Sequence, residues 1–288
     1  MSIFSFRRSR TLKPAWSYIA PGLVWRLLLS TSGICVGETR DQHKKEVSFF
    51  ALNALSGEVL WANRVFDELW WIGIEAVTKD VLLLHTYAQP DRPEHKGILA
   101  VELATGKRMW TQSDVTYWFD HEEKIYAYRT LFERRVGCEF DVQTGELLCE
   151  YDEDLDTLMS LRRSALSESS QDGFLFPQLA VASEEDPRIA SCIQKKVSHV
   201  LLQGDVEYVR LGDLLLFNYH RQSDTKSQKE LLLENHFHIV DLKNGGNLFS
   251  DVLSSNSRAP VPDSFFVKDG TAYFVKDQTT LTAIPLTV

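Results

Sequence analysis

The segment ALNALSGEVLW, residues 51–61, decides the fold of this chain because the chain repeats it. Related segments are AVELATGKRMW at residues 100–110, EFDVQTGELLC at residues 139–149 and IVDLKNGGNLF at residues 239–249. Aligned copies share a glycine, with Asn, Asp or Glu four residues earlier. Glycine supplies the positive φ that a tight turn needs, and an Asp or Asn side chain can accept hydrogen bonds from turn amides. Each segment therefore predicts a β-hairpin.

A bulky or apolar residue follows each glycine by four positions, and these residues are Trp61, Trp110, Cys149 and Phe249. Counting outward from the turn places Trp61 opposite Phe50, Trp110 opposite Leu99 and Cys149 opposite Cys138. The two thiols are therefore predicted to be neighbours. A packed pair of free thiols is favoured over a disulfide or redox pair.

Two further short strands precede each hairpin, as in WIGIEAV followed by DVLLLHTY and in VTYWFD followed by EKIYAYRT. Each unit then contains four antiparallel strands, and units of about 40–50 residues with a turn glycine and an aromatic residue are typical of propeller blades. The sequence predicts an all-β protein, a β-propeller of four-stranded antiparallel blades that forms a single domain over residues 1–288.

The ends of the chain predict how the ring closes. TLTAIPL, residues 280–286, matches the third strand of the repeat, and PGLVWRLLL, residues 21–29, resembles the fourth. We therefore expect the N-terminal strand at residues 22–28 to pair with residues 280–286. The long gap between Gly145 and Gly245 leaves room for two blades, so six blades are expected. The alternative is five, if residues 152–204 are an insertion and not a degenerate blade.

Composition limits the partners. Lys and Arg number 31 against 40 Asp and Glu, a net charge of -9 that disfavours binding to nucleic acid. The basic residues near the start of the chain, within residues 1–14, are interpreted as a solvated tail. No run approaches the roughly 20 apolar residues of a membrane span, and no secretory signal or CxxC pair is found, so a cytoplasmic protein is expected.

Residues 51–61, 100–110 and, more loosely, 139–149 resemble the repeat of the quinoprotein-like (PQQ-repeat-like) β-propeller superfamily, Ala-Leu-Asp followed by Thr-Gly and Trp. The chain looks like a small, functionally uncharacterised bacterial member, which implies a fold but no activity. Alcohol dehydrogenases of that superfamily use a vicinal cysteine pair, a calcium site and a catalytic Asp. None of these can be located in this sequence, so no cofactor is expected, no PQQ site is identified and the catalytic residues are unknown.

Two aromatic clusters lie where the innermost strands of the blades are expected to begin. FDELWWIGIEA contains Trp70 and Trp71, and VTYWFDHEEK contains Tyr117, Trp118 and His121. Near a channel mouth, such groups can stack on a sugar or a flat ligand or anchor a peptide. Packing between blades is the favoured alternative for the aromatic residues.

A weaker candidate is a metal site in ENHFHIVD. His236 and His238 are two apart on a predicted strand, so they share a face with Glu234. Two His and a carboxylate can hold a metal ion, but no further ligand is identified. Solvated or interface histidines are the favoured alternative.

No GxSxG, P-loop, HExxH or dinucleotide-binding motif occurs in the sequence. We therefore expect a non-catalytic propeller scaffold that binds a protein partner or a small ligand at one channel mouth. The alternative is an enzyme that acts on a sugar or uses a quinone or metal cofactor.

Overall fold

The computed structural model describes residues 11–89, 92–132, 134–152, 155–169, 173–180, 186–223 and 232–287. The chain divides into two compact units. The first unit is Ala20–Asp172, and the second unit combines Met1–Ile19 with Gly173–Val288. Of the predicted basic tail, residues 1–10 lie outside the described residues, while the Leu12 amide donates a hydrogen bond to the Leu248 carbonyl.

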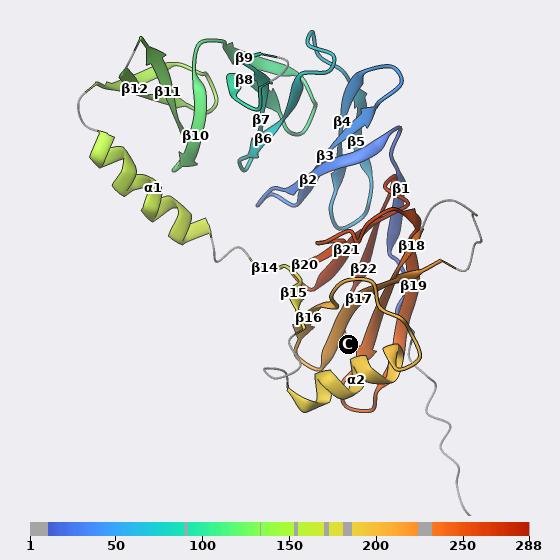
Figure 1. Ribbon diagram of the computed structural model, residues 1–288. Coiled ribbons are helices and arrows are strands. Elements are labelled where there is room, and N and C mark those ends of the chain that lie inside the picture. Colours follow the sequence, from blue (N-terminus) through green and yellow to red (C-terminus); the bar gives the residue numbers. More distant parts are fainter. Residues whose placement is uncertain are drawn as a thin grey trace, which may run out of the picture. The chain divides into compact units, whose positions relative to one another are not determined.

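The first unit contains three sheets, each made of four consecutive antiparallel strands (Figure 1). The first sheet is β2(Leu23–Leu29), β3(Ile34–Asp41), β4(Glu46–Asn53) and β5(Val59–Arg64). The second sheet is β6(Ile72–Val77), β7(Val81–Tyr87), β8(His95–Glu102) and β9(Arg108–Gln112). The third sheet is β10(Thr116–His121), β11(Lys124–Leu131), β12(Arg134–Asp141) and β13(Leu147–Tyr151), followed by α1(Leu155–Ser169).

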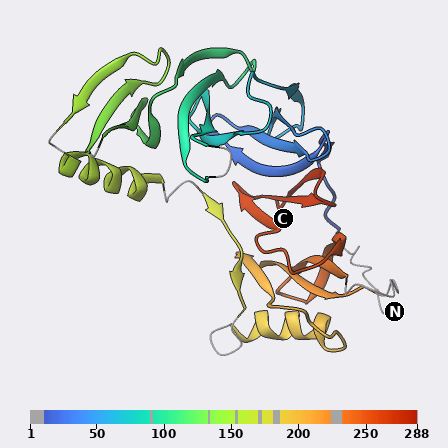
Figure 2. The same cartoon turned by 45° about the horizontal axis from the view of Figure 1, so that its top comes forward.

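The second unit contains two five-stranded antiparallel sheets. One is ordered β15(Gln178–Leu179), β16(Glu207–Leu211), β17(Leu214–Gln222), β18(Leu233–Asp241) and β19(Gly246–Ser257). The other is ordered β1(Trp16–Ile19), β22(Thr280–Pro285), β21(Thr271–Lys276), β20(Phe265–Lys268) and β14(Phe174–Leu175). The helix α2(Pro187–Val197) lies beside the first of these sheets (Figure 2).

These meandering antiparallel sheets make the protein mostly β, in agreement with the predicted propeller-like class. Apolar side chains are buried between neighbouring sheets. Ile74 and Leu84 of the second sheet pack with residues of the first sheet, whereas Leu83 packs with Ile125 and Phe140 of the third. Among the described residues, no helix is long and apolar enough to cross a membrane.

The predicted pairing of residues 22–28 with residues 280–286 is wrong. An N-terminal strand does complete the C-terminal sheet, but it is β1, with Trp16 opposite Ala283. Residues 22–28 instead belong to β2, where Leu23 lies opposite Arg40. A tight turn in which the Ser30 amide donates to the Ile34 carbonyl joins β2 to β3. Such a local hairpin closes a much shorter loop than pairing with residues 280–286 would.

The four repeated hairpins share a turn and a β-bulge. In the first, Gly57 has a φ of 73°, and Oδ1 of Asn53 accepts hydrogen bonds from the Leu55 and Ser56 amides. The register then shifts by one residue in the outgoing strand. The same shift follows the hairpins of β8–β9, β12–β13 and β18–β19. The positive φ of the glycine and the hydrogen bonds of the turn are thus as predicted, whereas the bulge was not predicted.

The bulge overturns the predicted cross-strand partners. Trp61 lies opposite Ala51 and Trp110 opposite Ala100, one residue away from Phe50 and Leu99. Likewise, Cys149 lies opposite Glu139, and Cys138 lies opposite Glu150. Successive residues of a strand face opposite sides, so Cys149, opposite Glu139, lies on the other face of the sheet from Cys138. Cys138 is buried and Cys149 is exposed. The two thiols are therefore not a packed pair.

The repeated tryptophans link neighbouring sheets of the first unit. The Trp61 indole donates a 2.8 Å hydrogen bond to the Leu103 carbonyl, and Trp110 donates one of 3.0 Å to Val142. Each indole thereby covers the hairpin turn of the next sheet. A Cβ atom on Gly106 would lie 2.8 Å from the Trp61 ring, so the turn glycine is required by packing as well as by its φ of 68°.

The segment 152–204 contains the two helices and two short edge strands. Residues 189–194, IASCIQ, lie in α2, so this part of the segment is a helix and not a strand of a degenerate blade. This helix begins at Pro187, its N-cap Asp186 accepts a hydrogen bond from the Arg188 amide, and its buried residues are Ile189, Cys192, Ile193 and Val197. The three- and four-residue intervals between these buried residues are typical of one face of a helix, and Asp186 caps its first turn.

Candidate functional site

The first strand of each sheet in the first unit carries a bulge at the same place. The bulged residues are Trp25 in β2, Glu75 in β6 and Trp118 in β10. A bulge leaves one residue unpaired and redirects its side chain. The bulged residue is a tryptophan in the first and third sheets, but it is a glutamate, Glu75, in the second sheet.

The redirected Glu75 carboxylate meets two histidines. Its Oε2 lies 2.8 Å from Nδ1 of His95, in a hydrogen bond, and 3.0 Å from Nδ1 of His85. The two imidazole rings are stacked, with centroids 3.4 Å apart and an interplanar angle of 8°. The side chains of His85, Glu75 and His95 are 5%, 16% and 33% exposed. Among the described residues, this is one group of three that could hold a metal ion.

Local packing fixes both rings. His85 in β7 lies opposite Gly73 in β6, and His95 in β8 lies opposite Tyr87. The Tyr87 ring meets both imidazoles edge-on, with centroid distances of 5.3 and 5.4 Å. Trp71 in turn contacts Tyr87 at 5.6 Å. Trp71, one of the predicted site residues, therefore packs against the Tyr87 ring that contacts both imidazoles.

A second buried carboxylate lies nearby. Glu38 in β3 accepts hydrogen bonds from Arg40 at 2.7 Å and from the Ile74 amide at 2.9 Å. The position that a Cβ atom on Gly73 would occupy is 3.1 Å from Oε2 of Glu38 and 3.2 Å from Nε2 of His85. The glycine thus leaves a space that is bordered by a carboxylate and an imidazole.

Electrostatics favours a charged Glu75. Burial alone would raise the pKa of this carboxyl group, but its contacts with His85 and His95 outweigh burial and lower the pKa. The neighbouring Tyr117 has a raised pKa because of burial, the Asp120 carboxylate and the charge of Glu75. Tyr117 therefore stays a neutral phenol that donates its hydrogen bond to Asp120.

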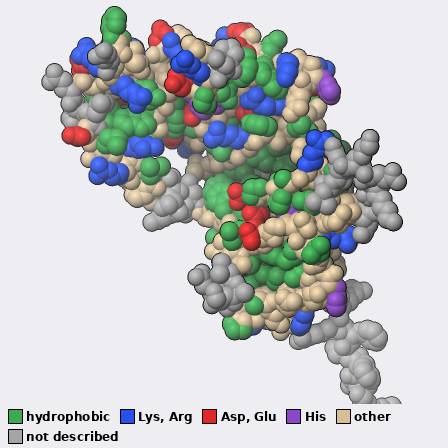
Figure 3. Space-filling view, in the orientation of Figure 1, with side chains coloured by type: hydrophobic (Ala, Val, Ile, Leu, Met, Phe, Trp, Pro, Cys, Tyr) green, Lys and Arg blue, Asp and Glu red, His purple; other side chains and the backbone are tan. Residues whose placement is uncertain are grey.

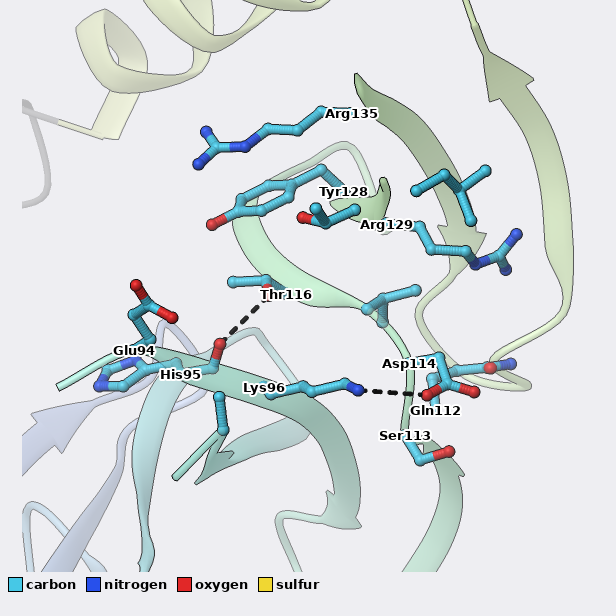
Figure 4. A pocket seen from close by; sticks show the side chains of 14 residues that line it. Glu94, His95, Lys96, Gln112, Ser113, Asp114, Thr116, Tyr128, Arg129 and Arg135 are labelled. Atoms are coloured by element: carbon cyan, nitrogen blue, oxygen red, sulfur yellow. Dashed lines mark hydrogen bonds and ion pairs between the residues drawn. The ribbon is translucent and has the colours of Figure 1, made fainter. Parts of the chain in front are cut away.

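A pocket of 780 Å³ opens beside His95, between the second and third sheets (Figure 4). Its charged lining residues are Glu94, Lys96, Asp114, Arg129 and Arg135. The Arg135 guanidinium lies 4.6 Å from the centre of the Tyr128 ring. Lys96 is 3.4 Å from Asp114, and the Thr116 hydroxyl donates to the His95 carbonyl at 3.1 Å.

Trp70 and Trp71 contact different parts of the protein. Trp70 packs against the core shared by the first and second sheets, and two cations lie over its ring: Arg40 at 5.2 Å and Lys45 at 4.7 Å. Trp71 is 36% exposed and contacts Tyr87. The Trp70 side chain therefore packs against the core, whereas the Trp71 side chain is partly exposed to solvent.

The predicted residues of the third sheet have separate surroundings. Tyr117 joins the core between the second and third sheets and bonds to Asp120. Trp118 meets Phe119 at 5.6 Å and lies near Arg162 of α1, at 6.0 Å. His121 is half-buried at the end of β10, at the turn to β11. The structure does not gather these three side chains around one cavity.

Of the predicted metal candidates in β18, Glu234 and His236 bond to protein groups, whereas neither ring nitrogen of His238 is hydrogen-bonded within the described residues. Oε2 of Glu234 accepts a hydrogen bond from Arg221 at 3.0 Å and lies 2.9 Å from Nε2 of His236. The Tyr219 ring stacks on His236 at 5.3 Å and on His238 at 5.7 Å. Burial, with the nearby positive charge of Lys196 as a smaller cause, lowers the pKa of His238 to about 4.

Sequence reasoning missed Glu75, His85 and His95. The strands WIGIEAV and DVLLLHTY were predicted, and they contain two of the three residues. No short motif joins the residues, because they lie on three successive strands at ten-residue intervals. The signal available was a carboxylate or a histidine on each of three successive strands of one blade.

The fold and the cluster define an all-β protein of propeller-like sheets with a polar site in its second sheet. Residues 29–110 match a family described as a domain of unknown function, DUF4905. This segment includes Glu75, His85 and His95. No curated protein matches the chain.

A comparison with solved structures finds similarity to a chain described as a bifunctional GH43-CE protein of Bacteroides eggerthii. The sequence identity is 11% and the TM-score is 0.26. The alignment covers 96% of this chain and 34% of that one, so the chain spans about a third of the length of that structure.

Proposed function

We propose that this protein is a non-catalytic, propeller-like scaffold that binds a small anionic ligand in the pocket between the second and third sheets. The observation that carries the proposal is the 780 Å³ pocket itself. Its volume falls within the range of about 300–1,000 Å³ that is usual for small-molecule sites. The alternative for a scaffold is that it binds a protein partner at a channel mouth.

Charge supports an anionic ligand. The chain has a net charge of -9, yet the pocket has three cationic side chains, Lys96, Arg129 and Arg135, against the carboxylates of Glu94 and Asp114. Basic and acidic side chains are interspersed over the face of the first unit seen in Figure 3. The pocket is therefore a local excess of positive charge on an acidic protein, which attracts anions.

Arg135 and Tyr128 supply the recognition surface. Within the described part of the chain, Arg135 has no ion-pair partner, whereas Arg129 is 2.9 Å from Glu150. A guanidinium held over an aromatic ring presents its N–H groups in a plane that suits carboxylate or phosphate oxygens. In Figure 4 the two side chains lie together at one end of the pocket.

The finer classification forms part of the same proposal. The repeated hairpins support membership of the quinoprotein-like superfamily, and the five sheets of the described residues support the five-blade alternative. The four cysteines are free thiols, which supports a cytoplasmic location. Together they describe a small intracellular propeller that binds a metabolite.

A ligand screen by thermal shift, followed by calorimetry, tests the proposal. Sugar phosphates, nucleotides and dicarboxylates are the probes, because each carries the negative charge that the pocket favours. Arg135→Ala should weaken binding of a hit by about 10-fold or more, since a charge-assisted hydrogen bond is worth roughly 1.5–3 kcal/mol. Arg163→Ala, which removes an exposed cation of α1, is the matched control. Equal affinity of Arg135→Ala and the unsubstituted protein would place the ligand elsewhere.

One observation favours the alternative of an enzyme. His95 belongs both to the pocket lining and to the Glu75 cluster, so a bound ligand would lie close to ionisable groups. Turnover of a sugar or a quinone-dependent oxidation that is lost in Glu75→Gln would favour the enzyme over the scaffold. Binding without turnover would favour the scaffold.

A further inference from the structure

We propose that Glu75, His85 and His95 bind a divalent first-row transition-metal ion, with Zn²⁺ as the reference ion. The three residues offer two imidazoles and one carboxylate, a donor set that these metals accept. This inference goes beyond the proposed function and does not depend on the identity of the pocket's ligand.

The distances suit a shared ion. One ligand atom from each residue can be chosen so that all three lie within 4.8 Å of one another. Ligands at roughly 2.0–2.2 Å from a tetrahedral zinc ion are about 3.4 Å apart. The carboxylate oxygen is 3.0 Å from Nδ1 of His85 and 2.8 Å from Nδ1 of His95, shorter than this separation, so binding of an ion requires the carboxylate to draw back and the stacked rings to turn toward the ion.

His85 supplies an independent argument for a ligand. It is 4% exposed, and neither of its ring nitrogens makes a hydrogen bond within the described part of the chain. Its Nδ1 nevertheless points at Glu75, 3.0 Å from Oε2. Buried polar groups in native proteins nearly always have partners, and an unsatisfied imidazole is unfavourable. A metal ion at this point would bind a ring nitrogen of His85 and the Glu75 carboxylate together.

The alternative is a carboxylate hydrogen-bonded by two histidines. That arrangement accounts for Nδ1 of both histidines, but it leaves the buried Nε2 of His85 without a hydrogen bond within the described residues. A metal ion would instead use one ring nitrogen of each histidine as a ligand.

The surrounding strands hold the donors in place. Glu75 projects from a bulge, and both histidines lie on the neighbouring paired strands β7 and β8. The edge of the Tyr87 ring restrains the two imidazoles. Ligands on sheet strands and locked by packing form a more rigid site than ligands on loops.

The site is open on one side. His95 is one-third exposed and lines the pocket, whereas His85 is buried. Three protein ligands leave a fourth tetrahedral position vacant, as catalytic and ligand-binding metal sites do. An anion in the pocket would approach the metal from the side of His95.

Equilibrium dialysis of the untagged, full-length protein against Zn²⁺, with the metal counted by mass spectrometry, tests the site. We expect one zinc ion per chain. Glu75→Gln and His95→Ala should each weaken binding by more than about 100-fold, since loss of even an outer partner of a ligand costs roughly 10- to 100-fold. Cobalt substitution should give a visible d–d band that both variants lose.

The control is His43→Ala, which removes an exposed histidine of the first unit and should keep one zinc ion per chain. Circular dichroism verifies the fold of each variant, and Glu75→Gln keeps the shape of the side chain if His95→Ala unfolds. Arg135→Ala should also retain zinc, so loss of the pocket's ligand and loss of the metal are separate results. Absence of stoichiometric zinc, zinc retained by Glu75→Gln, or zinc lost from His236→Ala instead would overturn the proposal.

Discussion

At the scale of single residues, glycine and tryptophan explain why one short segment recurs. Gly106 needs a positive φ, and the Trp61 indole occupies the space where its side chain would be. In the first two repeats the Asn or Glu and the glycine belong to the hairpin turn, and the indole packs on the turn of the next repeat, so one pattern specifies both the hairpin and the contact between sheets. The sequence was sufficient to predict the hairpin because its chemistry is local.

Gly106→Ala tests this double requirement. Alanine at a φ of 68° should cost about 1–2 kcal/mol, and displacement of the Trp61 ring should add about 1–3 kcal/mol. Gly33→Ala is the matched control, because Gly33 has a φ of 80° and nothing within 4 Å of its Cβ position. Urea unfolding measures both free energies. Equal losses would show that the indole does not restrict position 106.

His238 should make the stability of the protein depend on pH. Burial lowers its pKa from the ordinary value of about 6.5 to about 4, so the folded state favours the neutral ring. This stability is complete above pH 6.5 and is lost as the pH falls toward 4, by up to about 3 kcal/mol. His238→Phe, beside the Phe217 and Tyr219 rings, should flatten the decline in urea unfolding between pH 7 and pH 4.5. A decline as steep as that of the unsubstituted protein would contradict this role of His238.

At the scale of elements, the β-bulge separates what the sequence could predict from what it could not. Counting residues outward from Gly145 predicts the correct partners only as far as Phe140 and Leu147, after which one extra residue shifts the register. The bulged residues of the four hairpins are Leu60, Met109, Leu148 and Leu248. These are ordinary strand residues and give no sign of a bulge, so Cys138 and Cys149 were placed together wrongly. The candidate site depends on another such bulge, at Glu75, and on a stack between two strands. Neither the bulge nor the stack of side chains produces a recognisable spacing of residues in the sequence.

The N-terminal strand β1 provides a test at the same scale. Trp16 is half-buried, pairs with Ala283 and meets the Tyr273 ring at 6.1 Å, whereas Ile19 in the same strand is 76% exposed. Trp16→Ala should destabilise the protein by about 1–3 kcal/mol and Ile19→Ala by less than about 0.5 kcal/mol. Thermal and urea unfolding compare the two variants. Equal stability would argue against the pairing of β1 with β22.

At the scale of the whole molecule, propeller-like sheets combine an acidic exterior with one locally basic pocket. The chain has a net charge of -9, and the lining of the pocket has more cations than carboxylates. Composition predicted the acidic balance, but it gave no sign of the pocket, which forms where the second and third sheets meet. Repeated antiparallel sheets provide such positions between them, and the residues placed there determine what is bound.

Anomalous diffraction from crystals of the full-length protein grown with Zn²⁺ tests the account most directly. The account predicts a peak at the zinc absorption edge that lies about 2.0–2.2 Å from Glu75, His85 and His95, with its open side toward the pocket. A zinc peak beside Glu234 and His236, or none at the cluster, would contradict it. In that case the Glu75 carboxylate and the two imidazoles would form a buried polar contact within the second sheet.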